Sequence, residues 1–249
     1  MKICKFYKCE EEAMRFHPSG YCFQCYQNDP NIISRKGVKR LKVLDLFSGL
    51  GGFSEAFLLN HDEVLRIENN PLLSEVRNTT MMDVLKLRDI LRDGLDQGEL
   101  NPYFANIDLI VASPPCYDFS LAFSAPQAIA SRRGEFEEYS PDMELVEATL
   151  EIIEMLKPRF WVIENVRGSI RHFEKLGLIP QQKFQAYVFY GQFPQIKVPE
   201  RLPTKAEKDK RHSPIRSNIR ALIPLELSEA FREAILNQKT IFDFMGVEE

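Results

Sequence analysis

The chain has 249 residues, of which 44% are hydrophobic and 27% are charged. This composition fits one globular domain with a sizeable core plus a small appendage, and it excludes a fibrous or fully disordered protein. No apolar run reaches the roughly 18 to 20 residues of a membrane span, and the N-terminus lacks the apolar region of a signal peptide. We therefore expect a cytoplasmic protein, associated with a nucleoid or, if it is viral, present in the host cytoplasm.

The net charge of −4 is unevenly distributed along the chain. Residues 1–40 carry eight Lys and Arg against four Asp and Glu, and residues 195–220 carry eight against three. The two segments therefore hold charges of +4 and +5, and the remainder holds −13. Two basic segments beside an acidic body are compatible with a phosphate-binding face, although ordinary solvated charge explains such runs equally well.

The first 25 residues contain four of the five cysteines, with the spacing Cys-x4-Cys-x12-Cys-x2-Cys. This spacing is close to that of a four-thiolate zinc site, and it suits metal binding in a reducing compartment better than disulfides. His17 could replace one cysteine, and four unrelated thiols are the alternative. We expect residues 1–38 to form a zinc knuckle or ribbon-like module that contacts phosphates or braces the rest of the chain. Its structural zinc would be bound by Cys4, Cys9, Cys22 and Cys25.

Residues 39–249 alternate short apolar runs with amphipathic stretches, a pattern typical of an α/β domain with a mostly parallel sheet wrapped by crossover helices. Strands are expected at residues 41–47, 64–68, 107–112, 160–164 and 185–190. Apolar residues at helical spacing predict helices at residues 143–157 and 225–236. Residues 113–141 and 192–220 are rich in Pro, Ser, Gly and charge, and they are interpreted as long loops.

The first expected strand runs into the glycine-rich segment Asp45-Leu46-Phe47-Ser48-Gly49-Leu50-Gly51-Gly52. Glycines at such a turn let the backbone approach a ligand, although the spacing differs from Gly-x-Gly-x-x-Gly and similar turns occur without ligands. Glu68 ends the second strand, where a carboxylate can accept hydrogen bonds from ribose hydroxyls. Asp83, further along, could meet an adenine edge. Together these residues indicate a nucleotide-type crevice.

The third strand runs into Ser113-Pro114-Pro115-Cys116, which delivers a thiol to the carboxyl edge of the sheet. A lone cysteine is more often inert than nucleophilic, so its surroundings decide its role. Glu164-Asn165-Val166 ends the fourth strand and brings a carboxyl group to the same edge. A thiol and a carboxyl group that converge there suit nucleophilic addition with protonation of a ring nitrogen.

In this order and on these strand ends, the three motifs resemble the cofactor loop, the Pro-Cys loop and the Glu-Asn-Val motif of cytosine-5 DNA methyltransferases. The resemblance covers residues 41–191 well and residues 216–236 loosely. It implies a Rossmann-like, doubly wound catalytic domain at residues 39–249 that uses S-adenosylmethionine. The cofactor-binding residues that it implies are Asp45, Phe47, Ser48, Gly49, Gly51, Gly52, Glu68, Asn69, Asp83, Pro114 and Asn218.

The resemblance also implies the chemistry. Cys116 would add to carbon 6 of cytosine while Glu164 stabilises the protonated N3, so that carbon 5 becomes nucleophilic enough to take the methyl group. Loss of the carbon 5 proton would then expel the thiolate. Because a stacked base is out of reach, the target would be flipped out of a duplex or lie in a single strand.

The chain departs from the family pattern in three places. In the segment 180–185, Lys183 and Gln185 stand where the family has arginines, and we count Lys183 among the candidate catalytic residues. Tyr117 follows the Pro-Pro-Cys sequence where the DNA enzymes commonly have Gln, as in a small phage and microbial branch. Only about 25 residues separate Gly191 from Arg216, where the family has a target-recognition domain of many tens of residues.

The preferred interpretation is a restriction-modification or phage-type DNA methyltransferase of low sequence specificity, with duplex or single-stranded DNA as its partner. A tRNA-modifying branch shares these motifs, so RNA is the alternative substrate. A catalytically silent module that binds nucleic acid or cofactor is the third interpretation, which the two arginine replacements support.

Overall fold

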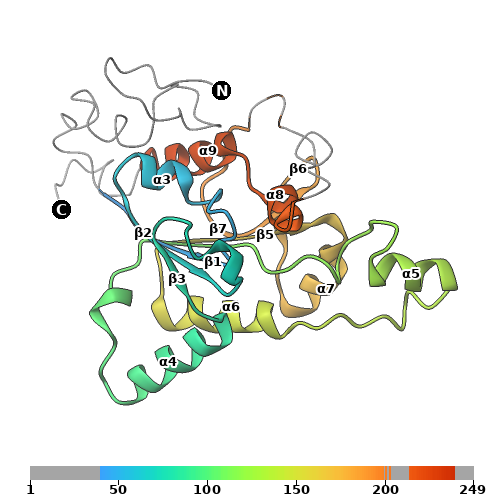
Figure 1. The fold of residues 1–249 in the computed structure, drawn as a ribbon, viewed down its shortest axis with the longest axis horizontal. Helices are drawn as coiled ribbons and strands as arrows, with labels where there is room; N and C mark the ends of the chain where they lie inside the picture. Colours follow the sequence, from blue (N-terminus) through green and yellow to red (C-terminus); the bar gives the residue numbers. More distant parts are fainter. Residues whose placement is uncertain (1–39, 199, 201, 203–212, 239–249) are drawn as a thin grey trace.

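The computed structural model describes residues 40–198, 200, 202 and 213–238. A seven-stranded sheet with the order β3-β2-β1-β4-β5-β7-β6 forms the centre of this part of the chain (Figure 1). The strands β1 to β5 are parallel, and β7 runs antiparallel to both β5 and β6. The strands are β1 (Lys42–Leu46), β2 (Glu63–Glu68), β3 (Thr79–Met81), β4 (Leu109–Ala112), β5 (Phe160–Val166), β6 (Pro180–Phe184) and β7 (Tyr187–Gln192).

The central strands are apolar on both faces because helices cover both sides of the sheet. Val43 and Leu44 are successive residues of β1, both fully buried, and they belong to the cores on opposite faces. One face packs against α3 (Glu55–Leu59) and α9 (Leu225–Leu236), and the other against α4 (Val84–Asp96) and α6 (Glu144–Leu156) (Figure 1). The shorter helices are η1 (Pro71–Leu73), η2 (Pro102–Phe104), α5 (Pro126–Arg133), η3 (Arg167–Ser169), α7 (Ile170–Phe173), η4 (Glu174–Leu176) and α8 (Arg216–Ala221).

The strand order reverses between β1 and β4. The chain moves outward from β1 to β2 and β3 on one side, and from β4 to β5 on the other. Loops that leave adjacent strands in opposite directions open a crevice at the carboxyl edge, which is where open α/β sheets bind ligands. The segments after β1 and β4 are the glycine-rich segment and the Ser-Pro-Pro-Cys segment, so the topology brings these two motifs to one crevice.

Most of the predicted elements are confirmed. The five strands and the two long helices form where the sequence placed them, and α9 has the predicted bounds. The last predicted strand begins two residues later than expected, because Gln185 adopts φ 50° in the turn between β6 and β7. The segment 180–185 supplies an additional edge strand, β6. This strand starts at Pro180, and a proline is tolerated at the start of an edge strand.

Two helices form inside segments that were interpreted as loops. α5 begins with Pro126, whose fixed φ suits a first helical turn, and ends at Gly134 in the left-handed conformation. α8 lies in the second predicted loop and buries none of its residues fully. Both helices lack a continuous apolar stripe, so their sequences carry little helical periodicity. None of the helices in the described part of the chain combines the length and hydropathy that a membrane span requires.

Candidate active site

The glycine-rich loop after β1 is fastened to the end of β2 by Glu68. The Gly49 N–H donates to Oε2 of Glu68 at 2.7 Å, while Oε1 accepts from the N–H groups of Asn69 at 3.0 Å and Asn70 at 2.8 Å. A carboxylate offers about four acceptor positions, so these bonds leave one for a ligand. Glu68 thus ends β2 as the sequence predicted, and it also shapes the loop.

A buried polar network supports the same loop from behind. Arg66, on β2, donates from Nη2 to the Gly51 carbonyl at 2.8 Å and to a Glu55 carboxylate oxygen at 2.7 Å. Its Nε donates to the Ser54 hydroxyl at 2.9 Å, and that hydroxyl donates to Asp45 at 2.6 Å. Gly51 has φ 77°, and a Cβ there would overlap the Arg66 guanidinium. The loop conformation therefore depends on both the glycine and the arginine.

Asp45 is the acidic member of this network, and it lies behind the loop with 1% of its surface exposed. Burial raises its pKa to about 6, against the lowering effects of the Arg66 charge and the Ser54 hydrogen bond. The structure thus places Asp45 and Gly51, both predicted to bind cofactor, where they set the shape of the loop.

The far side of the crevice is built by Asp83, Asn69 and Asn218. Asp83 caps α4 through Leu85 N–H at 2.8 Å, and its second oxygen accepts from the Asn69 side chain at 3.1 Å. Asn218, on α8, accepts from the Asn70 side chain at 3.4 Å. The structure therefore brings together three of the predicted cofactor residues from segments that are up to 149 positions apart.

Asn218 reaches the crevice because the segment before α9 packs against the glycine-rich loop. A Cβ on Gly52 would overlap the Ile223 carbonyl, and a Cβ on Gly49 would lie 3.9 Å from the Asn218 side chain. Two small residues in the loop thus allow the C-terminal segment to approach it closely. Phe47, also in this loop, has φ 57° and is partly buried against the core below the sheet.

The residues present fit a nucleoside-type ligand. Ser48 and Ser113, which follow β1 and β4, have buried hydroxyls without hydrogen-bond partners among the described residues. Buried polar groups are normally paired, so unpaired hydroxyls on both sides of the crevice are available to a ligand. The carboxylates of Glu68 and Asp83 suit the hydroxyls and amine of an adenosine, and they favour a ligand that carries positive charge.

The loop that carries Cys116 is fixed to β5. The Asn165 side chain donates to the Pro114 carbonyl at 3.1 Å, and its Oδ1 accepts from the Val166 N–H at 2.9 Å. Asn165 is 1% exposed, so this bond is shielded from water. Cys116 and Glu164 are both partly buried, on the loop and the strand that this bond connects. The two residues therefore lie on the loop after β4 and at the end of the adjacent strand β5, at the carboxyl edge of the sheet.

The segment after Cys116 is held by a second buried contact, which the sequence did not reveal. Gln127 donates to the carbonyls of Phe119 at 3.4 Å and Gly168 at 3.3 Å, and its Oε1 lies 2.6 Å from Nε2 of His172. Because the Gln127 oxygen can only accept, His172 donates through Nε2. Burial lowers the pKa of His172, with Arg171 adding to the effect, and a lower pKa favours the neutral ring.

Lys183 lies on the edge strand β6. It is exposed on β6, in register with Val188 of β7, which in turn pairs with Asn165 of β5. The strand β7 thus separates Lys183 from the strand that carries Glu164. Cys4, Cys9, Cys22 and Cys25 lie outside the described residues.

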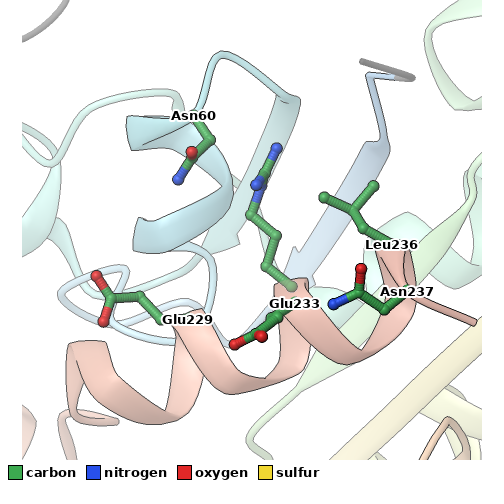
Figure 2. A pocket seen from close by; sticks show the side chains of 6 residues that line it. Asn60, Glu229, Glu233, Leu236 and Asn237 are labelled. Carbon is green, nitrogen blue, oxygen red and sulfur yellow. The ribbon is translucent and has the colours of Figure 1, made fainter. Parts of the chain in front are cut away.

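A hollow of about 350 Å³ lies elsewhere, between the end of α3 and the outer side of α9 (Figure 2). Figure 2 shows Glu229 and Glu233 along α9 and Asn60 across from them. Since α3 runs from the carboxyl end of β1 back toward the start of β2, Asn60 belongs to the amino edge of the sheet. The hollow is therefore separate from the crevice.

The fold is an α/β fold in which the glycine-rich loop and the Cys116 loop follow the neighbouring parallel strands β1 and β4. Comparison with known proteins identifies the family. The family model for C-5 cytosine-specific DNA methylases matches residues 41–179, more than half of the chain, and the chain belongs to this family.

Type II methyltransferase M.DdeI of Desulfomicrobium norvegicum is 28% identical over 131 residues, which are 52% of this chain and 29% of that protein. Type II methyltransferase M1.HphI of Haemophilus parahaemolyticus is 27% identical over 134 residues, 53% of this chain and 34% of that protein. The chain thus spans about a third of the length of these two relatives. The solved structure of the Entamoeba histolytica methyltransferase EhMeth covers 70% of this chain and 61% of its own, with 12% identity and a TM-score of 0.41.

Proposed function

We propose that this protein transfers a methyl group from S-adenosylmethionine to carbon 5 of cytosine in DNA. The observation that carries the proposal is the Asn165–Pro114 hydrogen bond, which joins the Cys116 loop to the strand of Glu164. The proposal is also supported by the glycine-rich loop, which follows the strand next to β4, and by the membership of the chain in the cytosine-5 methylase family. A nucleophile, a proton-holding group and a cofactor site are the three elements that the reaction needs.

In this mechanism the Cys116 thiolate attacks carbon 6 of the cytosine, and a carbon–sulfur bond forms. Glu164 holds a proton at N3, so the electron pair displaced from the ring double bond makes carbon 5 nucleophilic. S-adenosylmethionine supplies the electrophilic methyl group that carbon 5 takes up. The carbon 5 proton then passes to solvent water and the N3 proton returns to Glu164, so that the ring double bond re-forms and the carbon–sulfur bond breaks, which releases the thiolate.

Different residues of the chain would bind different parts of the cofactor. Glu68 would accept hydrogen bonds from the ribose hydroxyls. One hydroxyl would use its open acceptor position, and the other would replace one of the three backbone N–H donors. Asp83 and Asn69 would meet the adenine edge, and Phe47 its ring face. Ser48, Gly49, Pro114 and Asn218 would line the rest of the cofactor site, and Gly52 would act indirectly by letting the C-terminal segment approach the loop.

The substrate base has to leave its stack, because the carbon that Cys116 attacks is covered in a duplex. The experiment that tests the proposal supplies S-adenosylmethionine labelled in its methyl group, with either double-stranded DNA, single-stranded DNA or tRNA. We expect label in 5-methylcytosine of DNA. Label only in tRNA would make the protein an RNA methyltransferase, and binding without label would make it a silent module.

Two further parts of the proposal rest on sequence alone. The spacing of the four N-terminal cysteines supports a structural zinc ion in a module of residues 1–38, separate from the catalytic domain at 39–249. The basic residues between Lys197 and Arg220 would contact DNA phosphates in place of a target-recognition domain. Lys183, exposed near these residues in sequence, is proposed to act on the DNA side of the site.

A further inference from the structure

The helix α3, which follows the glycine-rich loop, is capped by a residue of a distant helix. The Ala56 N–H, in the first turn of α3, donates to the Ser228 hydroxyl at 3.0 Å, and that hydroxyl donates to the Phe53 carbonyl at 2.6 Å. Ser228 lies in the first turn of α9, 172 positions after Ala56, and it is fully buried. A single hydroxyl thus pairs with two main-chain groups at the point where the loop becomes a helix.

Ser54 occupies the position from which a serine normally caps a helix. It directly precedes α3, but its side chain makes no capping bond to the first turn in the described part of the chain. Its hydroxyl instead donates to Asp45 at 2.6 Å and accepts from Nε of Arg66 at 2.9 Å. The cap that Ser228 supplies therefore leaves Ser54 available to the polar network behind the glycine-rich loop.

A second contact between the same two helices fixes the position of Ser228. Arg232, one turn further along α9, donates from Nε to Asp62 at 2.7 Å, and Asp62 accepts from the Leu41 N–H at 3.0 Å. Asp62 follows the end of α3, so α9 is fastened beside both the start and the end of this short helix (Figure 1). The Ser228 hydroxyl is thus held at the start of α3 by the packing of two helices.

From these contacts we propose that Ser228 is a positioning residue for cofactor binding, which caps α3 from α9 and thereby leaves Ser54 to support the glycine-rich loop. The inference rests on the proposed function, because that function makes S-adenosylmethionine the ligand of the loop. Ser228 has no exposed surface, so it acts through the loop and not on the ligand.

The loss of the Ser228 hydroxyl would leave the Ala56 N–H buried without a partner, which is unfavourable. Ser54 stands where a side chain can supply another cap, by rotating its hydroxyl toward the first turn. That rotation would break the bonds of Ser54 to Asp45 and Arg66. The glycine-rich loop would then lose one of its supports, and the cofactor would bind more weakly.

The test measures the dissociation constant of S-adenosylhomocysteine by calorimetry. We expect Ser228→Ala to raise it about tenfold, because the loss of a buried hydrogen bond has an effect of this size. In methyl transfer the KM for S-adenosylmethionine should rise in parallel, while kcat should change by less than about twofold, as expected for a residue that affects cofactor binding alone.

Thr149→Val is the matched control for the loss of a buried hydroxyl. Thr149 is also fully buried, but it lies on α6, on the other face of the sheet, and its hydroxyl donates to the Leu145 carbonyl of its own helix at 2.7 Å. This variant should bind S-adenosylhomocysteine as the original protein does. Equal losses in Thr149→Val and Ser228→Ala would reduce the role of Ser228 to general stability.

A double-mutant cycle tests the route through Ser54. Ser54→Ala should weaken binding by a similar factor, and the double variant should bind no more weakly than Ser54→Ala, because Ser228 acts through the Ser54 hydroxyl. Losses that multiply in the double variant, or an unchanged dissociation constant in Ser228→Ala, would overturn the inference. Ser228→Cys keeps the shape of the side chain with a weaker hydrogen-bonding group, and it takes the place of Ser228→Ala if that variant does not fold.

Amide hydrogen exchange of the cofactor-free protein separates this inference from the proposed function. Exchange at residues 48–54 should be faster in Ser228→Ala and unchanged in Thr149→Val, whatever ligand the loop binds. If the original protein methylates DNA while Ser228→Ala changes neither exchange nor binding, the positioning role is wrong and the function stands. If Ser228→Ala loosens the loop while the original protein methylates no DNA, the support of the loop is correct and the proposed chemistry is wrong.

Discussion

Asn165 donates a hydrogen bond from its buried side chain to the main-chain carbonyl of Pro114 at 3.1 Å. This contact connects β5, which carries Glu164, to the loop that carries Cys116, across 51 positions of sequence. Because Asn165 also binds the Val166 N–H, its amide is fixed in one orientation. The relative position of thiol and carboxyl group thus depends on an asparagine that needs no contact with the substrate.

Asn165→Ala should therefore impair catalysis more than binding. The change removes the donor and leaves the Pro114 carbonyl without this partner, so the Cys116 loop can shift. A displacement of about 1 Å can cost roughly a hundredfold in rate. We expect kcat to fall by about that factor while the KM for S-adenosylmethionine changes only a few-fold, measured by steady-state methyl transfer. Asn101→Ala, at an exposed cap of η2, is the control, and equal losses in both variants would contradict the positioning role.

The covalent mechanism predicts different outcomes for the two reacting groups. Cys116→Ser should abolish methyl transfer, since a serine hydroxyl is a far weaker nucleophile than a thiolate. Glu164→Gln should lower the rate severely, because the amide cannot stabilise the protonated ring nitrogen in the same way. Calorimetry should show that both variants bind the cofactor within a few-fold of the original protein. Near-normal turnover by Cys116→Ser would rule out the mechanism.

The buried carboxyl group of Asp45 predicts a pH dependence of stability. Its pKa is raised from 3.8 to about 6 in the folded protein, so the folded state binds this proton more tightly than the unfolded chain. The group therefore favours folding below about pH 4, and this contribution is lost as the pH rises toward 6. An asparagine side chain does not titrate, so the Asp45→Asn variant lacks this pH-dependent contribution to stability.

Between pH 4 and pH 7, the free energy of unfolding of the original protein should fall by roughly 2 to 3 kcal/mol relative to Asp45→Asn. Urea denaturation of both proteins at the two pH values measures this difference. Asp96→Asn, at an exposed position at the end of α4, serves as the control for the loss of one carboxyl group. A constant difference between the original protein and Asp45→Asn would show that Asp45 does not titrate in this range.

The N-terminal cysteines predict one zinc ion per chain. Elemental analysis of the purified protein should find it, and the pair Cys22→Ser and Cys25→Ser should lose it, because each removes a thiolate ligand. Cys116→Ser should keep the metal and is the matched control. Absence of zinc, together with four thiols that react freely under native conditions, would refute the site.

The short segment between β7 and α8 predicts low sequence specificity. Few side chains remain there to contact base edges in the major groove, so the methylated context should cover about one to three base pairs. Phosphate contacts would supply most of the affinity, and binding should fall steeply with salt. Genome-wide mapping of methylated cytosines measures the length of the methylated context. A long, strictly methylated site would contradict low specificity.

Reversing the charges of Lys208, Lys210 and Arg211 tests whether phosphate contacts supply most of the affinity for DNA. We expect weaker binding to all DNA sequences and a flatter salt dependence, by about 0.9 per lost phosphate contact on the logarithmic scale. Lys86→Glu, at an exposed position on α4, is the control. An unchanged salt dependence in the triple variant would place phosphate binding elsewhere.

The strands and the motifs at their ends were predictable because their signals are local. An apolar run such as residues 107–112 has to be buried, and a parallel sheet brings the carboxyl ends of its strands to one edge. That rule alone places Cys116, Glu164, Glu68 and the glycine-rich loop together. Helices α5 and α8 escaped prediction because neither buries a continuous apolar stripe, so their sequences resemble loops.

The sequence by itself therefore determined which chemical groups share the crevice, and the tertiary structure decided how they are held. Arg66, Gln127 and Asn165 act on main-chain carbonyls of distant segments, and a carbonyl is present at every residue. The sequence of the accepting segment therefore does not indicate such a contact, whereas apolar periodicity is visible in the sequences of both elements that pack together. The supports of the glycine-rich loop and of the Cys116 loop appear only when the folded backbone brings donor and acceptor within hydrogen-bonding distance.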